Sequence, residues 1–212
     1  MNYQEEECML AYLLERDGLS HEKLYALSYV SKFELSLKRN LNKFNKEELL
    51  KEAMDVATWY DEQYDIFEEI TIDYRIKSNN SIRIKYDKFY PDTPVEKTFN
   101  DLLGFRSICD NYDSVLKLSS HNEFKVVDMS NGKKKDDGYR GVHIYFQKDH
   151  HCYPIEIQYN TYYDRQLNNW LHMYIYKRED SDVIGSKMRV LYEQGKIKTE
   201  EDFRKELEKC AM

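Results

Sequence analysis

Two carboxylates in the central part of the chain could together act on phosphate groups. Asp101 and Glu156 are 55 residues apart, yet each lies at or within a strand-like segment. Phosphoryl-group transfer requires carboxylates that hold a divalent cation, basic groups that neutralise phosphate, and a group that positions or deprotonates the attacking hydroxyl. Asp101 and Glu156 can supply the metal ligands and the base. The pattern therefore predicts a metal-dependent enzyme that acts on phosphates.

Basic side chains that could neutralise phosphates occur in two stretches. The first stretch flanks Asp101 on both sides and contains Arg75, Lys77, Lys85 and Arg106. The second is a loop over residues 131–138 that could reach over bound phosphates and contains Lys133, Lys134 and Lys135. Three lysines in a turn are more often simply solvated, so the loop alone is a weak signal. The order and spacing of both stretches around the carboxylates favour a phosphate site.

Alternating apolar and polar residues predict four strands, at 104–109, 124–127, 139–147 and 153–159. Gly138 opens the third of these, and Tyr139 and His143 would share one of its faces because side chains alternate along a strand. The fourth places Glu156 and Gln158 together in the same way. Each strand then has one apolar face for the core and one polar face. Polar faces rich in His, Glu, Gln and Asn indicate a site.

Helical spacing surrounds these strands. Apolar residues recur at helical spacing from Leu24 to Leu37, Asn45 with Glu48 is typical of a helix N-cap, and 164–177 carries an apolar stripe. A last helix is expected after Thr199, ending near Cys210. Helices, a mixed sheet of about five strands and further helices give an α+β fold. We expect one domain over 1–212, with a helical part at 1–73, a catalytic core at 74–177 and a helical extension at 178–212.

Composition narrows the class of protein. The chain has 212 residues, of which 41% are hydrophobic and 33% charged, as expected for a globular domain. The net charge of −7 argues against a protein that wraps nucleic acid over its whole surface. Four widely spaced cysteines predict reduced thiols and no zinc site or disulfide framework. Without an apolar span of about 20 residues or a basic leader, we expect a cytoplasmic location and no membrane association.

The order of the motifs resembles the synthetase domain of RelA/SpoT-type enzymes, in particular the small stand-alone alarmone synthetases. The resemblance covers roughly 74–177, about half of the chain. The matching motifs are Arg75-Ile-Lys77 with Ser81 and Lys85, similar to the family's R-x-K…S-x-x-x-K; Asp101 to Arg106, similar to D-x-x-G-x-R; Gly138 to His143, similar to G-Y-x-S-x-H; Glu156 to Thr161, similar to E-x-Q-x-R-T; and His172 with Tyr176-Lys177.

This resemblance implies a nucleotidyltransferase-like synthetase fold and a pyrophosphokinase. ATP would donate its β,γ-pyrophosphate to the ribose 3′-hydroxyl of GDP or GTP, giving (p)ppGpp and AMP. Asp101 would bind Mg²⁺, and Glu156 would activate the hydroxyl or share the metal. The residues implied for ATP are Arg75, Lys77, Ser81, Lys85 and Arg106. The residues implied for the acceptor are Lys133, Lys134, Lys135, Gly138, Tyr139 (by stacking on the base), His143, Gln158, Asn160 and His172.

Two departures from the family pattern leave the acceptor open. Asn160 stands where the family usually has Arg, and Gly141 stands where Ser is common. Some proteins that resemble this family are toxins that modify the 3′-terminal adenosine of tRNA. Such an acceptor would require an outlying basic surface, for which the sequence offers Lys38, Arg39, Lys43 and Lys46. A neutralising antitoxin protein and a homo-oligomer are further partners that the resemblance allows.

A third interpretation is a catalytically inactive regulator that binds nucleotides. The presence of Asp101, Glu156 and Tyr139 argues against it, because an inactive protein would not need both carboxylates and the aromatic residue. The sequence does not decide between a free guanosine nucleotide and tRNA as the acceptor. We expect the free nucleotide, because the chain as a whole is acidic.

Overall fold

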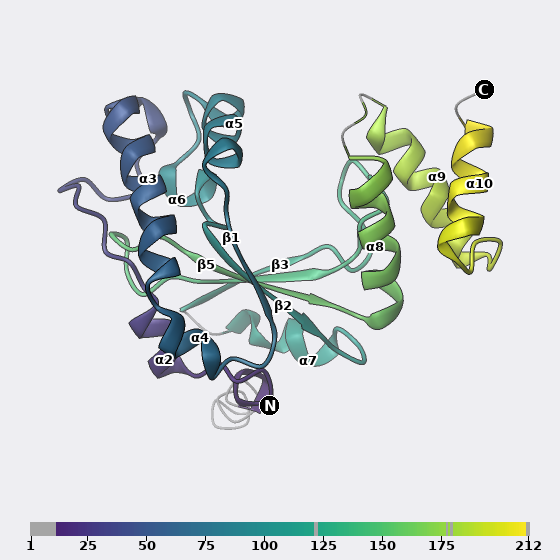
Figure 1. Cartoon of the computed structure of the whole chain (residues 1–212), viewed down its shortest axis with the longest axis horizontal. Coiled ribbons are helices and arrows are strands. Elements are labelled where there is room, and N and C mark those ends of the chain that lie inside the picture. Colours follow the sequence, from purple (N-terminus) through teal and green to yellow (C-terminus); the bar gives the residue numbers. More distant parts are fainter. Residues whose placement is uncertain (1–11, 121–122, 177, 179, 211–212) are drawn as a thin grey trace. The chain divides into compact units, whose positions relative to one another are not determined.

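Five strands form one sheet in the order β1-β2-β5-β4-β3 (Figure 1). The computed structural model describes residues 12–120, 123–176, 178 and 180–210. The strands are β1 (Asp73–Ile76), β2 (Leu103–Ile108), β3 (Phe124–Asp128), β4 (Val142–Phe146) and β5 (Ile155–Asn160). β1 runs antiparallel to β2, with Asp73 opposite Arg106.

β2 and β5 run parallel, which makes the sheet mixed. Near the start of both strands, the Gly104 backbone lies against Glu156, and near their ends the Cys109 amide donates to the Asn160 carbonyl at 2.9 Å. Both pairs advance in the same direction along the two strands. Together with the helices on either side in sequence, this confirms the predicted α+β fold with a sheet of about five strands.

Helices precede, interrupt and follow the strands. They are α2 (His21–Ala26), α3 (Lys46–Asp61), α4 (Tyr64–Glu68), α5 (Asn79–Phe89), α6 (Val95–Thr98), α7 (Asp113–Leu116), α8 (Tyr162–Tyr174), α9 (Ser181–Glu193) and α10 (Glu200–Cys210), with 3₁₀ turns at Leu41–Lys43 and Lys117–Ser120. Within the described residues, no helix combines the length and the apolar character needed to cross a membrane.

The chain divides into two compact units. The first unit contains the described residues up to Ser107, together with Lys117–Val126 and Ile144–Gln158. The second unit contains Ile108–Leu116, Val127–His143 and the described residues from Tyr159 onward. In the first unit α3 packs against α5 (Figure 1). The single domain expected from the sequence stays a prediction.

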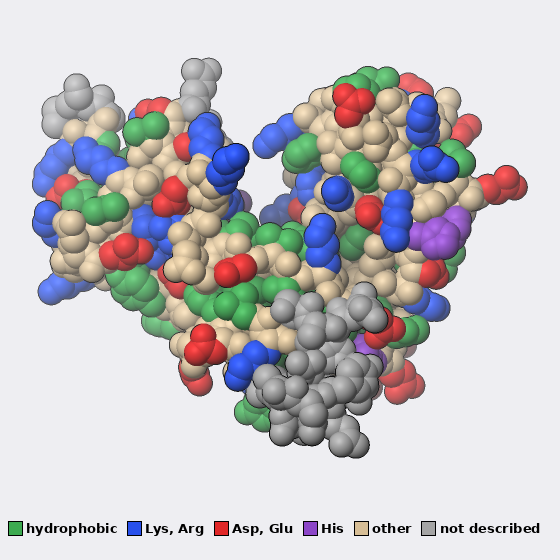
Figure 2. Space-filling view, turned by 180° about the vertical axis from the view of Figure 1, so that it is seen from behind, with side chains coloured by type: hydrophobic (Ala, Val, Ile, Leu, Met, Phe, Trp, Pro, Cys, Tyr) green, Lys and Arg blue, Asp and Glu red, His purple; other side chains and the backbone are tan. Residues whose placement is uncertain are grey.

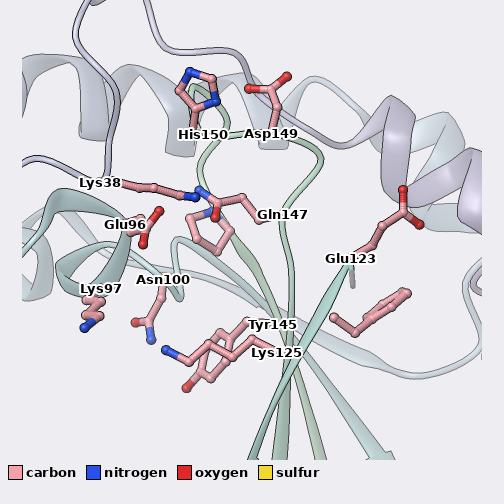
Figure 3. A pocket seen from close by; sticks show the side chains of 12 residues that line it. Lys38, Glu96, Lys97, Asn100, Glu123, Lys125, Tyr145, Gln147, Asp149 and His150 are labelled. Atoms are coloured by element: carbon pink, nitrogen blue, oxygen red, sulfur yellow. The ribbon is translucent and has the colours of Figure 1, made fainter. Parts of the chain in front are cut away.

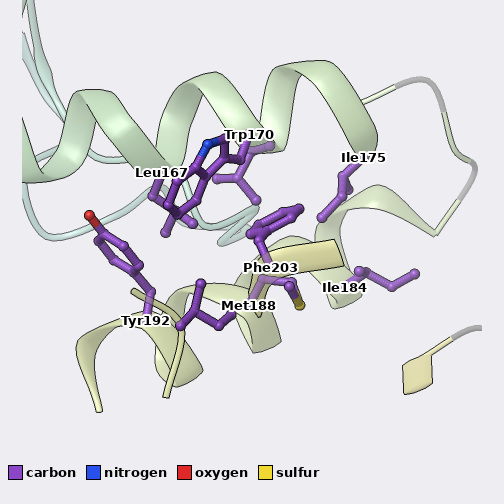
Figure 4. Packing of buried hydrophobic residues seen from close by; sticks show 9 residues of the cluster. Leu167, Trp170, Ile175, Ile184, Met188, Tyr192 and Phe203 are labelled. Carbon is purple, nitrogen blue, oxygen red and sulfur yellow. The ribbon is translucent and has the colours of Figure 1, made fainter. Parts of the chain in front are cut away.

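The second unit has its own apolar core between α8, α9 and α10 (Figure 4). Leu167, Leu171 and Ile175 follow one another at helical spacing, and all three are fully buried. They pack with Met188 of α9 and Phe203 of α10. The apolar stripe predicted for 164–177 is therefore confirmed, and it is the face that holds the last two helices.

Both predicted helix caps are present. The Asn45 side chain accepts a hydrogen bond from the Glu48 amide at 3.1 Å, at the start of α3. The Asp202 amide donates to the Thr199 hydroxyl at 3.2 Å, and the Asp202 carboxylate accepts from the Thr199 amide at 3.1 Å. Each cap satisfies amide groups that a helix N-terminus leaves without partners.

The helix expected from the apolar spacing between Leu24 and Leu37 is wrong beyond Ala26. The chain continues without helix because its backbone groups bind elsewhere in the first unit. The Ser31 amide donates to the His151 carbonyl at 2.8 Å. The Ser31 hydroxyl donates to the buried Glu52 carboxylate at 2.6 Å. Tertiary hydrogen bonds thus override a spacing that by itself is compatible with a helix.

The predicted strand 139–147 begins too early. β4 starts at Val142, and Gly138 adopts a left-handed conformation with φ +85°, which does not continue a strand. The Arg140 guanidinium turns back to Asp136, with nitrogen–oxygen distances of 2.8 and 3.0 Å. Tyr139 therefore lies in a loop before β4 and not in the strand.

Candidate active site

In the first unit, the end of β1 and the start of α5 carry four of the predicted ATP-binding side chains. Arg75 is in β1, and Lys77 follows it at a position tied to β2 by a hydrogen bond from its amide to the Leu102 carbonyl. α5 then carries Ser81 and Lys85, four residues apart and so on one face of the helix. Because β1, Lys77 and α5 follow one another closely in the sequence, these basic side chains lie beside the start of β2.

Asp101 is held between two lysines. Its Oδ2 lies 2.6 Å from Lys77 Nζ, and its Oδ1 lies 2.8 Å from Lys85 Nζ. Lys85 Nζ also donates to Asn100 Oδ1 at 2.8 Å. Burial alone would raise the pKa of Asp101, but the ammonium groups of Lys85 and Lys77 outweigh it and hold that pKa below its ordinary value. Burial lowers the pKa of Lys85, although Asp101 opposes this.

Glu156 is the second carboxylate, and it lies buried in β5. Its Oε1 accepts a hydrogen bond from the Tyr145 hydroxyl at 2.9 Å, and its Oε2 accepts one from Gln158 Nε2 at 2.6 Å. A β-carbon on residue 104 would lie 3.4 Å from Glu156 Oε2. This is an ordinary van der Waals distance, so the carboxylate by itself does not require glycine at position 104.

The two carboxylates line one small cavity of about 40 Å³ in the first unit. Its lining consists of Arg75, Asp101, Gly104, Arg106, Glu156 and Gln158. This volume is sufficient for an ion or a few waters, since a single water needs about 10–15 Å³. The cavity is too small for a nucleotide, so a nucleotide bound here would lie mostly outside it.

The donor atoms suit Mg²⁺, which prefers hard oxygen ligands and is usually held by one or two carboxylates together with substrate phosphates. Asp101 and Glu156 supply two such carboxylates. Among the described residues there is no cluster of three or more side chains that could hold a metal alone. The residues therefore fit an ion that arrives with a phosphate-bearing substrate, with the remaining ligands from phosphate and water.

The predicted acceptor residues Tyr139, His143 and Asn160 lie together in the second unit. The Tyr139 hydroxyl is 2.6 Å from His143 Nε2, and the two rings meet edge to face at 5.5 Å between centroids. Asn160 is only 2% exposed, and its Nδ2 donates to the Arg140 carbonyl at 2.8 Å and to the Tyr139 hydroxyl at 3.4 Å. Asn160 is thus placed to position Tyr139.

The lysine loop is partly engaged within the second unit. Lys133 forms an ion pair with Asp137 at 2.5 Å, and its ammonium group lies 5.0 Å from the centroid of the Tyr139 ring. Lys135 forms an ion pair with Asp182, while Lys134 is exposed.

The remaining predicted acceptor residue, His172, lies on α8. Its side chain is exposed, and its ring meets Tyr176 edge to face at 6.1 Å. Lys177, the neighbour of Tyr176 in the terminal motif, lies outside the described residues.

A buried arginine that the sequence interpretation missed holds the loop before β4. Arg189 of α9 is 1% exposed, and its Nη1 lies 2.7 Å from Asp164 Oδ1. Its Nε donates to the Gly138 carbonyl at 2.8 Å, and Asn168 Nδ2 donates to the Arg140 carbonyl at 2.7 Å. The carbonyls on both sides of Tyr139 are thereby fixed. The available signal was the helical spacing of Arg189 with Tyr192, three residues later.

Comparisons with known proteins match the segment that contains most of these residues to one family. A family model with the description "Region found in RelA / SpoT proteins" matches residues 74–181. No curated protein sequence matches the chain.

Solved structures that are similar to the chain include two synthetase-type proteins. The small alarmone synthetase 1 from Bacillus subtilis bound to its product pppGpp is 24% identical, with a TM-score of 0.42 over 70% of this chain and 85% of that one. A GTP pyrophosphokinase family protein from Streptococcus pneumoniae is 18% identical, with a TM-score of 0.39 over 76% of this chain and 88% of that one.

Proposed function

Because the chain belongs to the family that shares the region found in RelA / SpoT proteins, we propose that it is an ATP-dependent pyrophosphokinase whose acceptor is GDP or GTP. The 3′-hydroxyl oxygen of the acceptor attacks the β-phosphorus of ATP. The bond from that phosphorus to the α,β-bridging oxygen breaks, and AMP leaves with the electron pair. The products are AMP and a guanosine nucleotide with a 3′-pyrophosphate.

The observation that supports this proposal most strongly is that Asp101 and Glu156 line one cavity together with two arginines. In the proposed reaction Glu156 takes the proton of the 3′-hydroxyl. Its hydrogen bonds from Tyr145 and Gln158 fix the orientation of the carboxylate and so the direction from which the hydroxyl approaches. Proton transfer to a positioned base contributes roughly 10²–10⁴-fold to a rate.

The basic residues of the first unit serve ATP in this proposal. Arg75 and Arg106 hold the nucleotide by phosphate contact or by stacking on adenine, for which a planar guanidinium is suited. Lys77 and Lys85 lie beside Asp101 and offset the negative charge of the phosphates. Ser81 can add a hydroxyl contact from the same face of α5 as Lys85.

Asp101 and Glu156 would hold Mg²⁺. When bound, the ion would offset the charge on the transferred pyrophosphate, as divalent cations do in phosphoryl transfer.

The second-unit residues serve the acceptor in this proposal. The Tyr139 ring stacks on the acceptor base, which is worth roughly 1–3 kcal/mol for a base on an aromatic side chain. His143 contacts the acceptor. Lys134 of the 131–138 loop is exposed and forms no ion pair among the described residues, so it can reach a phosphate.

The proposal is tested by incubating the protein with γ-labelled ATP and, in separate reactions, with GDP, GTP and deacylated tRNA. We expect label on GDP or GTP, together with release of AMP, and no label on tRNA. Label on none of the three acceptors would contradict the proposed activity.

A tRNA acceptor is the second candidate, and one observation favours it. Lys38, Arg39 and Lys43 are all exposed, while Lys46 forms an ion pair with Asp87 at 2.9 Å. Figure 2 shows several further Lys and Arg side chains on the part of the first unit that contains α3, α5 and α6. In the same assay a tRNA acceptor would give label on tRNA that falls steeply with added salt, because counterions are released on binding.

A further inference from the structure

A second and larger cavity of about 240 Å³ lies in the first unit (Figure 3). Residues from separate segments line it: Lys38 before the 3₁₀ turn Leu41–Lys43, Glu96 and Lys97 in α6, Lys125 in β3 and Tyr145 in β4. The predictions from sequence assign no role to this cavity. Its lining is largely polar and charged, which indicates a ligand with charged or hydrogen-bonding groups rather than an apolar one.

The charged side chains that line the cavity are three lysines and three carboxylates. The three lysines are Lys38, Lys97 and Lys125. Among the described residues their ammonium groups form no ion pair. Two of the three acidic groups are already engaged. Glu123 accepts from the Tyr25 hydroxyl at 2.6 Å, and Figure 3 shows its carboxylate directed away from Lys38. Asp149 accepts from the His151 amide at 2.7 Å. Lysines that converge from separate segments suit a phosphate group.

The third acidic group requires a donor. Glu96 Oε2 is buried and has no hydrogen-bond partner among the described residues. A buried carboxylate oxygen without a donor is unfavourable, so a ligand that brings an N–H or O–H group would be bound better than a bare anion. A phosphate for the lysines and a hydrogen-bond donor for Glu96 are both present in a nucleotide.

The cavity adjoins the catalytic carboxylates through two hydrogen bonds. Tyr145 lines it and also donates to Glu156 at 2.9 Å. Asn100 lines it and accepts from Lys85 at 2.8 Å, and Lys85 in turn holds Asp101. An occupant that contacts Tyr145 or Asn100 therefore changes the surroundings of both carboxylates without entering the smaller cavity.

Along β5 the two cavities are neighbours. Pro154, just before the strand, lines the larger cavity, while Glu156 and Gln158 line the smaller one. Tyr145 lines the larger cavity and donates to Glu156, which lines the smaller one, so both cavities open on the same face of the sheet. The larger one continues this face toward β4 and β3.

We propose that the larger cavity binds the phosphate group of a nucleotide, with the lysines on the phosphate and Glu96 on a donor of the base or ribose. The effect of this site on catalysis rests on the proposed function, whereas the binding of phosphate does not. The phosphate can come from a substrate that extends out of the catalytic cavity, or from a separate nucleotide that regulates it. The chemistry of recognition is the same in both cases.

Calorimetry with inorganic pyrophosphate tests the phosphate part on the full chain. The variant Lys38→Met/Lys125→Met removes two ammonium groups from the cavity. The control Lys32→Met/Lys51→Met removes two exposed lysines of the same unit that do not line it. We expect pyrophosphate binding to the larger cavity to weaken at least about tenfold in the cavity variant. Binding should stay unchanged in the control. Equal binding by the two variants would overturn the proposal.

Glu96→Gln tests the nucleotide part and does not depend on how well the lysine variant folds. Removal of a negative charge should tighten pyrophosphate binding, whereas GDP binding should weaken because the charged acceptor for its donor is lost. If GDP binding tightens as much as pyrophosphate binding, the ligand is not a nucleotide held through Glu96, and the assignment is wrong.

Steady-state kinetics of the cavity variant show whether the bound phosphate belongs to a substrate or to a separate regulatory nucleotide. A raised acceptor KM with an unchanged ATP KM assigns the site to the phosphate of the acceptor substrate. Unchanged KM values, together with lost pyrophosphate binding, assign it to a separate nucleotide. If the wild-type protein transfers pyrophosphate to no acceptor, the proposed function fails, and the calorimetry still decides whether the cavity binds phosphate.

Discussion

The side-chain amide of Asn160 occupies the space that a β-carbon on residue 141 would need. Such a carbon would lie 2.5 Å from Asn160 Nδ2 and 2.8 Å from the Tyr139 hydroxyl oxygen. Gly141 and Asn160 are the two positions at which the sequence departs from the Ser and Arg that are usual in the family. The two departures are therefore coupled by contact, and both bear on the position of Tyr139.

Gly141→Ala should lower the free energy of unfolding by about 1–3 kcal/mol, the usual cost of placing an extra methyl group in packed surroundings. Urea unfolding measures this. In the background Asn160→Ala, which removes the amide, the same change should cost less. An equal cost in both backgrounds would show that the two residues do not share this space.

Tyr139→Ala should weaken acceptor binding by roughly 1–3 kcal/mol, the value of base stacking on an aromatic side chain, and leave ATP binding unchanged. Calorimetry with a non-hydrolysable ATP analogue and, separately, with GDP measures both. Tyr139→Phe is the matched control, because it retains the ring and loses only the hydroxyl contacts with His143 and Asn160. A loss confined to the ATP analogue would place Tyr139 in the donor site.

Asp101→Asn and Glu156→Gln should each reduce pyrophosphate transfer by at least about 10²-fold, because each removes a charge needed for metal binding or proton abstraction. Both changes conserve shape, so the circular dichroism spectrum should be unchanged. The measurement is the rate at which label passes from γ-labelled ATP to the acceptor, together with the release of AMP. More than about a tenth of the wild-type rate in either variant would contradict the assigned roles, since lost acid–base help costs roughly 10²–10⁴-fold.

Acid should remove the stabilisation that the Asp101 carboxylate provides. Its folded-state pKa lies below the ordinary value for Asp, about 3.9, because Lys85 and Lys77 outweigh the effect of burial. The ionised group therefore stabilises the fold fully above that ordinary value, and the contribution is lost as the pH falls through the lowered pKa. The difference in unfolding free energy between wild type and Asp101→Asn should be constant above about pH 5. It should shrink in more acidic urea titrations, and a difference that grows in acid would reverse this assignment.

Arg189→Met should lower the free energy of unfolding by about 3–5 kcal/mol, because it leaves the nearly buried Asp164 carboxylate without its cationic partner. Arg178→Met provides the control. Arg178 is half-buried and pairs with the exposed Asp180 at 3.1 Å, so its loss should cost less than about 1 kcal/mol. Thermal and urea unfolding compare the two variants, and equal effects would mean that the Arg189 network does not stabilise the second unit.

The sequence identified Glu156 and Gln158 as neighbours on one strand face because Ile155 and Ile157 alternate with them, and this alternation is local information. It could not show that Tyr139 lies outside β4. The reason is the bond from Arg140 back to Asp136 together with the left-handed Gly138.

Long-range contacts decided the remaining differences from the prediction. The end of α2 depends on hydrogen bonds from Ser31 to residues 20 or more positions away, Glu52 and His151. The buried pair of Arg189 with Asp164 joins two helices whose packing no local pattern specifies. Spacing within one element predicted faces and caps well, whereas partners in other elements had to be seen in the structure.

The alternation in β5 makes this strand sensitive to changes of length. Ile155, Ile157 and Tyr159 are fully buried, while Glu156 and Gln158 line the smaller cavity of the first unit. Deletion of a single residue within β5 would exchange the two faces, placing the carboxylate in the apolar core and isoleucines in the cavity. Conservative substitutions at the apolar positions cost only part of the packing energy. A one-residue deletion in this strand would instead disrupt the core contacts and displace the Glu156 carboxylate at once.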